Sequence, residues 1–307
     1  MLTIFHKNFA LKLSPVGKVL WQTDIKNYPG SLKFSIILND NIQISNGDKV
    51  CFTYNKDKIF CGYIFSMTFL QDNIVNIVAY DQIRYLKNQN TEIYENMKAS
   101  EIFSKICKSY GLYTGEIDIT SYTIPFLSSY NSTLLGVLQK ALEIEEANTG
   151  DSFIIYDDFG MLTLKNTKSN LVPAIISRDN SKEFTYLREI DSDTYNCIKI
   201  KYGNSKKGFS ENVFKEDRNN VKKWGILQLC KNADNFENAE NKAKILLKNK
   251  NREKESFSIE VLGGNSKIRA GAKVTILHNE KQNIMTIKKA IHSFSNGEHN
   301  MILEALI

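Results

Sequence analysis

The spacing of apolar residues along the chain changes from a period of two to a period of 3.6 and then back to two. Up to about residue 88 the apolar residues alternate, as Leu32 and Phe34 do with Lys33 and Ser35. Alternation of this kind places one face of a strand in a core. Turn-forming residues divide the segment into strands expected at about 32–38, 50–54, 58–69 and 74–80. Several short strands at such spacing predict a first β-barrel or sandwich over residues 1–88.

The middle of the chain, residues 89–171, follows helical spacing. Apolar residues recur at helical intervals over about 99–110 and again over about 132–148, and each run stops near a glycine. Such runs indicate amphipathic helices with one buried face. A hairpin follows at 153–164, with its turn at 157–160. Two helices and a hairpin predict a compact α+β module.

The last part, residues 172–307, returns to strands and is interrupted by one helix at about 234–250. Asp234 at the start of this helix and Glu237 three residues later resemble a capping box. The residues expected on its buried face are Phe236, Ala239, Ala243, Leu246 and Leu247. The strands are expected at about 195–202, 257–262, 273–278, 284–292 and 300–306. We therefore predict a second β-barrel domain with an inserted helix.

A short pattern occurs twice, each time at the start of a predicted strand. Residues 47–50 read G-D-K-V and residues 271–274 read G-A-K-V, and two further strands follow each of them. Four residues leave both a chance match and a true repeat open. A true repeat would mean two versions of one β-barrel. The predicted fold class is α+β, mainly β, with two tube-like β-barrel domains flanking a small α+β module.

Composition and charge weigh against several classes of function. The 307 residues are 42% hydrophobic and 24% charged, which is ordinary for a globular chain with sizeable cores. Forty Lys and Arg residues against 34 Asp and Glu residues give a net charge of +6, but only six of the forty are arginines. Because bidentate recognition of phosphates and bases favours the guanidinium group, specific nucleic-acid binding is not indicated.

The start of the chain does not read as a signal peptide, because Lys7, Lys12 and Lys18 interrupt its weakly apolar residues. The longest uncharged apolar stretch, Ile59–Leu70, is shorter than the roughly 20 residues that cross a bilayer. We therefore expect no membrane span. The cysteines are odd in number and form no C-x-x-C pair, which predicts reduced thiols rather than a disulfide scaffold or a zinc site. These cysteines are Cys51, Cys61, Cys107, Cys197 and Cys230.

Asp158, Phe159 and Gly160 spell the metal-binding triplet of protein kinases. Neither a glycine-rich loop nor an H-R-D loop precedes them, so the sequence does not support a kinase. Aspartate and glycine between two alternating apolar strands are what a hairpin turn needs. We interpret the triplet as a turn.

His292 and His299 flank the loop 293–298 and, with Glu298, could in principle bind a metal. His292 ends one predicted strand and His299 begins the next. Hydrogen bonding at the end of a hairpin is therefore the favoured interpretation. The remaining histidines, His6 and His278, add no second cluster.

Glu143, Glu145 and Glu146 form a dense group of carboxylates on the second predicted helix. A glycosidase needs two carboxylates that face each other across a cleft. Successive glutamates on an amphipathic helix fan out instead, so we interpret them as a solvated face.

The strongest basic run is the segment 242–254, with lysines at 242, 244, 248, 250 and 254 and an arginine at 252. It lacks the interleaved aromatic residues of a single-strand binder. A solvated helix face is the favoured interpretation, and a docking face for an acidic partner is the alternative.

The sequence also lacks a nucleophile elbow, a Walker loop and a dinucleotide-binding fingerprint. It therefore predicts no catalytic, metal-binding or cofactor-binding residue, and it does not identify interface residues. A structural or assembly component is the favoured class of protein.

Several stretches, taken in order, resemble one family. The chain is similar to tail baseplate hub proteins of contractile-tailed phages, PBSX-like prophages and phage-tail-like (R-type) bacteriocins. The similar stretches are NIVNIVAYDQIRYLK (73–87), NMKASEIFSKICKSYGLYTG (96–115), the segment 134–164, AGAKV (270–274) and AIHSFSNGEHNMILE (290–304). The resemblance covers nearly the whole chain. Its specificity lies in the order of the stretches rather than in one motif.

The resemblance implies a non-enzymatic homotrimer without a cofactor, made in the bacterial cytoplasm and assembled into a tail baseplate. Each subunit of such a hub supplies two β-barrels, so three chains form a pseudo-sixfold ring. That ring joins the hexameric tail tube protein to the trimeric central spike protein. The tape measure protein and other baseplate proteins are further expected partners. The sequence does not separate a phage from a headless bacteriocin.

Two other functions stay open from the sequence. The first is a peptidoglycan hydrolase, or a carrier of one, at the tail tip. The chain shows no peptidoglycan-binding or hydrolase extension after its second predicted barrel, which puts a direct cell-wall role in doubt. The second is a nucleic-acid-binding module that uses the basic segment 242–254.

Overall fold

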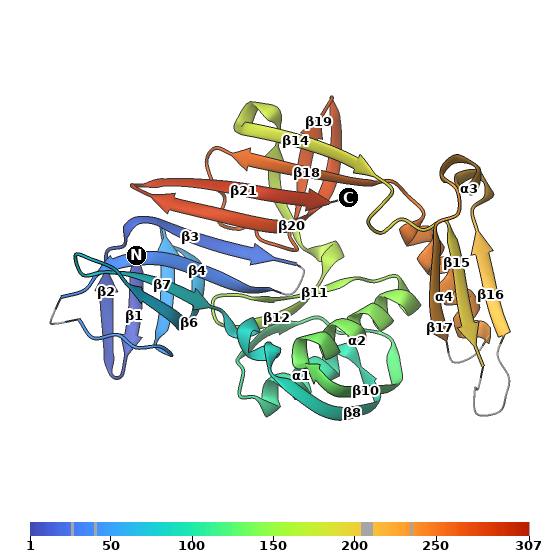
Figure 1. The fold of residues 1–307 in the computed structure, drawn as a ribbon, viewed down its shortest axis with the longest axis horizontal. Coiled ribbons are helices and arrows are strands. Elements are labelled where there is room, and N and C mark those ends of the chain that lie inside the picture. Colours follow the sequence, from blue (N-terminus) through green and yellow to red (C-terminus); the bar gives the residue numbers. More distant parts are fainter. Residues whose placement is uncertain (26–27, 40–41, 204–210, 234–235, 307) are drawn as a thin grey trace.

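The computed structural model describes residues 1–25, 28–39, 42–203, 211–233 and 236–306. Strands dominate it, in two large sets that lie edge to edge, with a mixed module below them (Figure 1). The first set lies at the left of Figure 1, the module beneath it, the second set at the top and a small further unit at the right. The predicted fold class, α+β and mainly β, is confirmed.

The first set contains seven strands in the order β3-β4-β7-β6-β5-β1-β2, and all neighbours are antiparallel. Their inward side chains form one apolar core, which includes Leu32, Phe34 and Ile77. The alternation at residues 32–34 thus reflects one buried face. The bounds are β1 (Leu2–His6), β2 (Phe9–Leu13), β3 (Val16–Asp24), β4 (Tyr28–Ile37), β5 (Lys49–Tyr54), β6 (Asp57–Phe69) and β7 (Ile74–Tyr80).

The predicted long strand 58–69 corresponds to β6. A tight turn precedes it, in which Asn55 and Lys56 both adopt left-handed backbone conformations with φ of 48° and 73°. The strands β1, β2 and β3 were not predicted. Most of β2 and the first half of β3 are exposed, so these segments lack the alternation that marks a half-buried strand.

The mixed module packs two helices against short strands. Phe103 of α1 and Leu138 of α2 share one core with Leu162 and Leu164 of β12. The α2 helix ends at Gly150, whose φ of 78° is left-handed, as expected for a glycine cap. The bounds are η1 (Gln82–Lys87), β8 (Gln89–Lys98), α1 (Ala99–Ser109), β9 (Thr114–Ile117), β10 (Thr123–Thr133), α2 (Leu134–Thr149), β11 (Phe153–Asp157), β12 (Leu162–Asn166) and η2 (Thr167–Ser169).

The second set has the order β13-β19-β20-β21-β18-β14. Only β13 and β19 are parallel, and the other neighbours are antiparallel. The core contains Phe257, Val274 and Leu303. The bounds are β13 (Leu171–Ile176), η3 (Arg178–Asn180), β14 (Ser181–Glu189), β18 (Lys254–Val261), β19 (Lys273–His278), β20 (Lys281–Ser295) and β21 (Glu298–Leu306).

A small unit is inserted between β14 and β18, at the right of Figure 1. Its three-stranded sheet has the order β16-β15-β17, and Ala239 and Ala243 of α4 pack on Ile198 and Ile200 of β15. The insertion is therefore larger than the single helix that the sequence predicted. The bounds are β15 (Cys197–Tyr202), β16 (Glu211–Glu216), α3 (Arg218–Trp224), β17 (Gln228–Ala233) and α4 (Phe236–Lys250).

The first turn of α4 differs from the predicted inserted helix. The expectation that Phe236 lies on its buried face is wrong, because this side chain is exposed at the first turn. The proposed cap, Asp234, and the side chain of Glu237 lie outside the described residues.

The two large sets of strands repeat one arrangement. In the first set, the amide of Gly47 donates to the carbonyl of Ile64 at 2.8 Å; in the second, the amide of Gly271 donates to the carbonyl of Ile287 at 2.7 Å. The amide of Ile64 donates to the carbonyl of Asp48, and the amide of Ile287 donates to the carbonyl of Ala272. The two short G-x-K-V patterns therefore begin equivalent strands.

The strand registers agree as well. Lys49 lies opposite Tyr63, and its equivalent Lys273 lies opposite Thr286. Two residues further on, each of the long strands β6 and β20 has an irregularity in its pairing with the next strand, at Phe65 in β6 and at Lys288 in β20. Matching core positions follow from these registers, namely Leu32 and Phe257, Val50 and Val274, Ile64 and Ile287, Ile77 and Leu303, and Ala79 and Ala305. The pattern in the sequence is a structural repeat.

Candidate functional site

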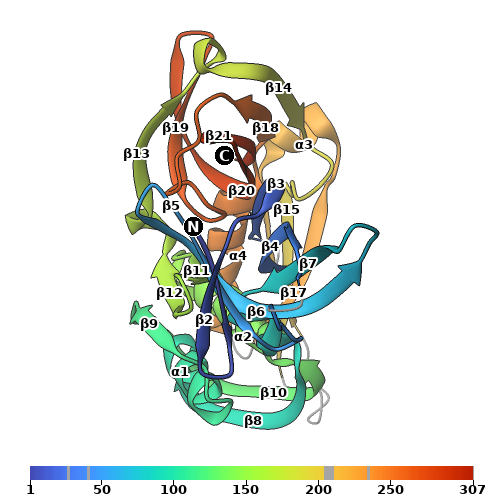
Figure 2. The ribbon, with the colours of Figure 1, turned by 90° about the vertical axis from the view of Figure 1, so that its left-hand side faces the viewer.

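The two repeats meet where β3 pairs with β20, and this junction joins all their strands into one 13-stranded sheet. Along one edge of β20, β19 covers residues 281–286 and β3 covers residues 289–294. Trp21 lies opposite His292 at the centre of the junction, and the two rings stack with centroids 4.8 Å apart. Figure 2 shows β3 against β20 in a second view. Backbone pairing and ring stacking together hold the two repeats edge to edge.

His292 is fully buried in this junction and has a partner at each ring nitrogen. Its Nε2 lies 2.7 Å from the carbonyl oxygen of Ile268, which can only accept, so this nitrogen carries the proton. Its Nδ1 then accepts from Nε2 of His299 at 2.8 Å. Burial, together with the nearby His299, lowers the pKa of His292 to about 3. The interpretation of these histidines as hydrogen-bonding groups at a hairpin end is confirmed.

Asp81, Asp157 and Arg269 form a buried charged cluster at the meeting point of the first repeat, the mixed module and the second repeat. The Asp81 carboxylate accepts from the amides of Gly30 at 2.8 Å and Ile83 at 3.0 Å. Arg269 donates to the backbone carbonyl of Asp157 at 2.6 Å. Burial raises the pKa of both aspartates, the charge of Asp157 raises that of Asp81 further, and Arg269 opposes both increases. No sequence motif marked these residues, because their pairing depends on three separate parts of the fold.

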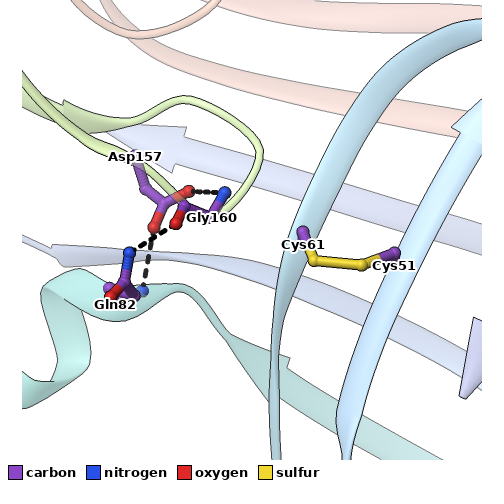
Figure 3. The surroundings of a disulfide bond; sticks show 5 residues. All are labelled: Cys51, Cys61, Gln82, Asp157 and Gly160. Carbon is purple, nitrogen blue, oxygen red and sulfur yellow. Dashed lines mark hydrogen bonds between the residues drawn. A yellow bond between two sulfur atoms is a disulfide. The ribbon is translucent and has the colours of Figure 1, made fainter. Parts of the chain in front are cut away.

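Gln82 connects the end of the first repeat to the hairpin of the module (Figure 3). Its backbone amide donates to the Asp157 carboxylate at 3.2 Å, and its side-chain amide donates to the carbonyl of Gly160 at 2.7 Å. The same side chain exchanges hydrogen bonds with the backbone of Tyr113. Each of these groups is satisfied by a structural partner, so the arrangement fixes the parts of the fold relative to one another.

Similarity to known proteins identifies the family of the chain. The YqbQ-like protein family matches residues 19–305, which is most of the chain. The chain belongs to the YqbQ-like family. A relative, the phage-like element PBSX protein XkdQ of Bacillus subtilis (strain 168), is 25% identical over 295 residues, which are 91% of this chain and 88% of XkdQ.

Solved structures share the fold of this YqbQ-like protein. The tail protein from Neisseria meningitidis MC58 superposes with a TM-score of 0.74 at 10% identity, over 100% of this chain and 96% of that one. The E. coli protein c3393, a type VI secretion component described as similar to the T4 tail proteins gp27 and gp5, gives 0.62 at 12% identity over 99% of this chain and 76% of its own. The resemblance to tail proteins found in the sequence is thereby confirmed for the fold.

The kinase-like triplet of the YqbQ-like protein is a turn, as predicted. Phe159 and Gly160 have φ of 52° and 87°, and the amide of Gly160 donates to the Asp157 carboxylate. Asp157, which precedes the triplet, is the residue that makes the buried contacts. Asp158 is exposed.

The interpretation of Glu143, Glu145 and Glu146 as one solvated face is wrong for Glu145. This side chain is completely buried and accepts from the amide of Ser121 at 2.9 Å, from the Ser121 hydroxyl at 3.0 Å and from the amide of Tyr122 at 2.9 Å. These bonds satisfy the loop that precedes β10. A glutamate that stands between two other glutamates in the sequence gives no sign that a loop will cover it.

Replacing Glu145 by alanine is expected to lower the free energy of unfolding by about 3 kcal/mol, because two part-buried backbone amides and the Ser121 hydroxyl lose a charged acceptor. Glu143→Ala, on the exposed side of the same helix, is the matched control and should change it by less than about 0.5 kcal/mol. Urea unfolding followed by circular dichroism measures both. Equal effects of the two substitutions would contradict the role of Glu145.

Several basic side chains of the segment 242–254 have local partners. Lys244 lies 3.1 Å from Glu240, and Lys250 and Lys254 lie 2.6 Å and 3.6 Å from Asp193. Two carboxylates, Glu240 and Asp193, therefore face three of the six basic residues of this run. This pattern agrees with the favoured interpretation as a charged helix face.

The prediction that all cysteines are reduced thiols is wrong for one pair, since Cys51 and Cys61 form a disulfide (Figure 3). They lie directly opposite each other on β5 and β6, with Cα atoms 4.1 Å apart. Their spacing in the sequence matches no motif, so the register of the two strands decides the pairing. Cys107 and Cys197 are buried free thiols, and Cys230 is an exposed one.

Within the part of the chain that the structure describes, no group of three or more His, Cys, Asp or Glu side chains is placed to hold a metal ion. Among the same residues, no helix has the length and apolar character needed to cross a bilayer.

Proposed function

We propose that this protein is the structural hub of a contractile-tail baseplate. Three copies form a ring of six similar β segments, and the ring joins a hexameric tail tube to a trimeric spike. The tail tube protein and the spike protein are its main partners, and the tape measure protein and other baseplate proteins are further ones. In this role the chain performs no catalysis.

One observation carries the proposal, namely the structural repeat within a single chain. Two segments that share the order of five strands, their register and one irregularity are joined edge to edge through β3 and β20. A threefold assembly of such chains offers six nearly equivalent segments. It can therefore match a sixfold partner on one face while it keeps threefold symmetry on the other.

The relatives and the buried contacts support the same role. XkdQ is named for the phage-like element PBSX, and the solved structures with this fold include phage tail proteins. The hydrogen bonds that join Gln82, Asp157 and Arg269 hold the first repeat, the mixed module and the second repeat in one arrangement. A component that transmits force between a tube and a spike needs such rigidity.

Light scattering on the full chain at micromolar concentration, alone and together with the tube and spike proteins of the same gene cluster, tests the proposal. A species of three times the 35.1 kDa chain mass is expected. Electron cryo-microscopy of isolated tails should show three copies of the chain directly beneath the tube. A chain that is monomeric in solution and absent from isolated tails would overturn the hub assignment.

A further inference from the structure

Two strand edges lack the neighbour that their equivalents in the other repeat possess. On β20, β3 covers the edge from Lys289 to Phe294; on β6, β5 covers the same edge only as far as Tyr63. Within the described residues, no strand lies beside the rest of that edge, residues 66–69. Likewise β14, the equivalent of β3, pairs with β18 alone among the described strands.

The registers give the equivalent residues at these edges. Trp21 pairs with Leu32 on β4, and Tyr186 pairs with Phe257 on β18, so Tyr186 occupies the position of Trp21. The irregularities of β6 and β20 lie at Phe65 and Lys288. Phe69 and His292 each follow four residues later, so they occupy equivalent positions. The two rings that stack in the junction thus have aromatic counterparts on the two open edges.

The aromatic side chains on the open edges are more exposed than their equivalents in the junction, as expected if the open edges lack a neighbouring strand. Trp21 and His292 are 3% and 0% exposed, whereas Tyr186 is half-buried and Phe69 is 66% exposed. Leu70, which directly follows β6, and Leu187 of β14 are each about half exposed. Large apolar side chains on an open strand edge are unfavourable in water and mark a surface that another strand covers.

The two open edges cannot cover each other within one chain. In Figures 1 and 2, β14 lies at the top of the molecule and β6 lies well below it. The sheet order also places β18, β21, β20, β3, β4 and β7 between them. Two different edges that face away from each other suit a head-to-tail contact between copies, which closes a ring when the rotation allows it.

We propose that β14 of one copy pairs antiparallel with residues 66–70 of the next copy, and so reproduces the β3–β20 junction between subunits. The strand addition itself is argued from this chain alone, and only its closure into three copies rests on the proposed function. The register that follows places Tyr186 opposite Phe69. The remaining pairs are Glu189 with Ser66, Arg188 with Met67, Leu187 with Thr68 and Thr185 with Leu70.

This register is chemically consistent. The β6 side contributes only uncharged residues, so no like charges meet across the junction. The pair of Tyr186 and Phe69 replaces the stack of Trp21 on His292. The backbone groups of both open edges gain hydrogen-bonding partners, as they have in the junction within the chain.

Cysteine cross-linking tests the register. Thr68→Cys and Leu187→Cys, combined in a Cys230→Ser chain, should give covalent dimers and trimers under mild oxidation, both in the purified full chain and in isolated tails. Thr68→Cys with Arg188→Cys is the matched control, because neighbouring residues of a strand point to opposite faces. We expect at least tenfold more cross-linked product from the first pair than from the control.

A substitution at the open edge tests its contribution. Phe69→Asp should weaken self-association at least tenfold, measured by light scattering over a dilution series, and should leave the circular dichroism spectrum unchanged. Ile226→Asp, at a similarly exposed apolar side chain of the inserted unit, should leave association unchanged.

The outcomes separate this inference from the hub assignment. Trimers or tails in which the in-register cysteines cross-link no better than the control would overturn the β14–β6 pairing and leave the hub intact. Cross-linking in the predicted register by a chain that is absent from tails would support the pairing and refute the hub. A chain that neither self-associates nor cross-links, alone and in tails, would overturn both.

Discussion

Lowering the pH from 7 to 4 is expected to remove about 3 kcal/mol of unfolding free energy through His292 alone. The pKa of this histidine is lowered to about 3 in the folded chain, against an ordinary value of 6.5. Between these two values the unfolded chain binds a proton that the folded chain does not. Stability from this residue is therefore complete above pH 6.5 and is lost as the pH falls towards 3.

The structural reason is the set of partners around the ring. A proton on Nδ1 of His292 would point at the Nε2 proton of His299, so His299 would have to change to its other tautomer before its Nε2 could accept. The charged ring would also lie fully buried against Trp21, at the centre of the junction between the repeats. Acid should therefore weaken the β3–β20 junction first.

Urea unfolding of the full chain at pH 7, 5.5 and 4 measures this effect. His292→Gln keeps a side-chain N–H for the carbonyl of Ile268 but cannot take a charge, so its stability should fall less with acid than that of the wild type. His278→Gln, at the half-buried end of β19, is the matched control and should follow the wild type. A His292→Gln chain with the pH profile of the wild type would refute the assignment.

Replacing Arg269 by methionine is expected to cost about 3–5 kcal/mol at pH 8, because the substitution leaves the buried carboxylates Asp81 and Asp157 without their nearby positive charge. Arg269 also donates to the backbone of Asp157, and its guanidinium lies over the ring of Tyr156. The substitution therefore removes a hydrogen bond and a ring contact together with the charge.

The sign of the pH effect is opposite to that of His292. Burial raises the pKa of Asp81 and Asp157 in the folded chain, so the folded state holds protons that the unfolded state has released. Stability from these groups is lost as the pH rises from about 4 through the raised pKa values. Without Arg269 those pKa values rise further. The substitution should therefore cost more at pH 8 than at pH 5.

The same unfolding measurement at pH 5 and pH 8 tests this expectation. Arg178→Met, at an exposed arginine of η3, is the control and should change the free energy of unfolding by less than about 0.5 kcal/mol at both pH values. An Arg269→Met chain that loses the same stability at both pH values would show that the aspartates do not sense this charge.

Local patterns in the sequence predicted much of the fold. The helices α1 and α2, the long strand β6 and the hairpin of β11 and β12 lie where periodicity and turn residues placed them, because each depends on contacts within a short segment. In the sequence, only the four-residue G-x-K-V pattern indicated the repeat. Its registers and its shared irregularity became visible only once the strands were paired.

The failures have a common cause. Glu145 is buried because a loop more than 20 residues earlier in the chain covers it, and Cys51 meets Cys61 because two strands align in one register. Phe236 follows the helical pattern of α4 but lies at its first turn, where the Tyr202 ring contacts it edge-on and more than half of the side chain stays exposed. In each case the deciding neighbour comes from outside the segment whose pattern was read.

The sequence by itself determined the mainly β class, the positions of most helices and turns, and the resemblance to tail proteins, because these depend on local periodicity and residue type. Tertiary structure alone decided the junction of Trp21 with His292, the buried cluster around Arg269, and the open edges of β6 and β14. Strand pairing joins residues that are hundreds of positions apart in the chain. The physical reason is that a backbone edge carries the same hydrogen-bonding groups whatever its sequence, so only the arrangement in space shows which edges are already paired.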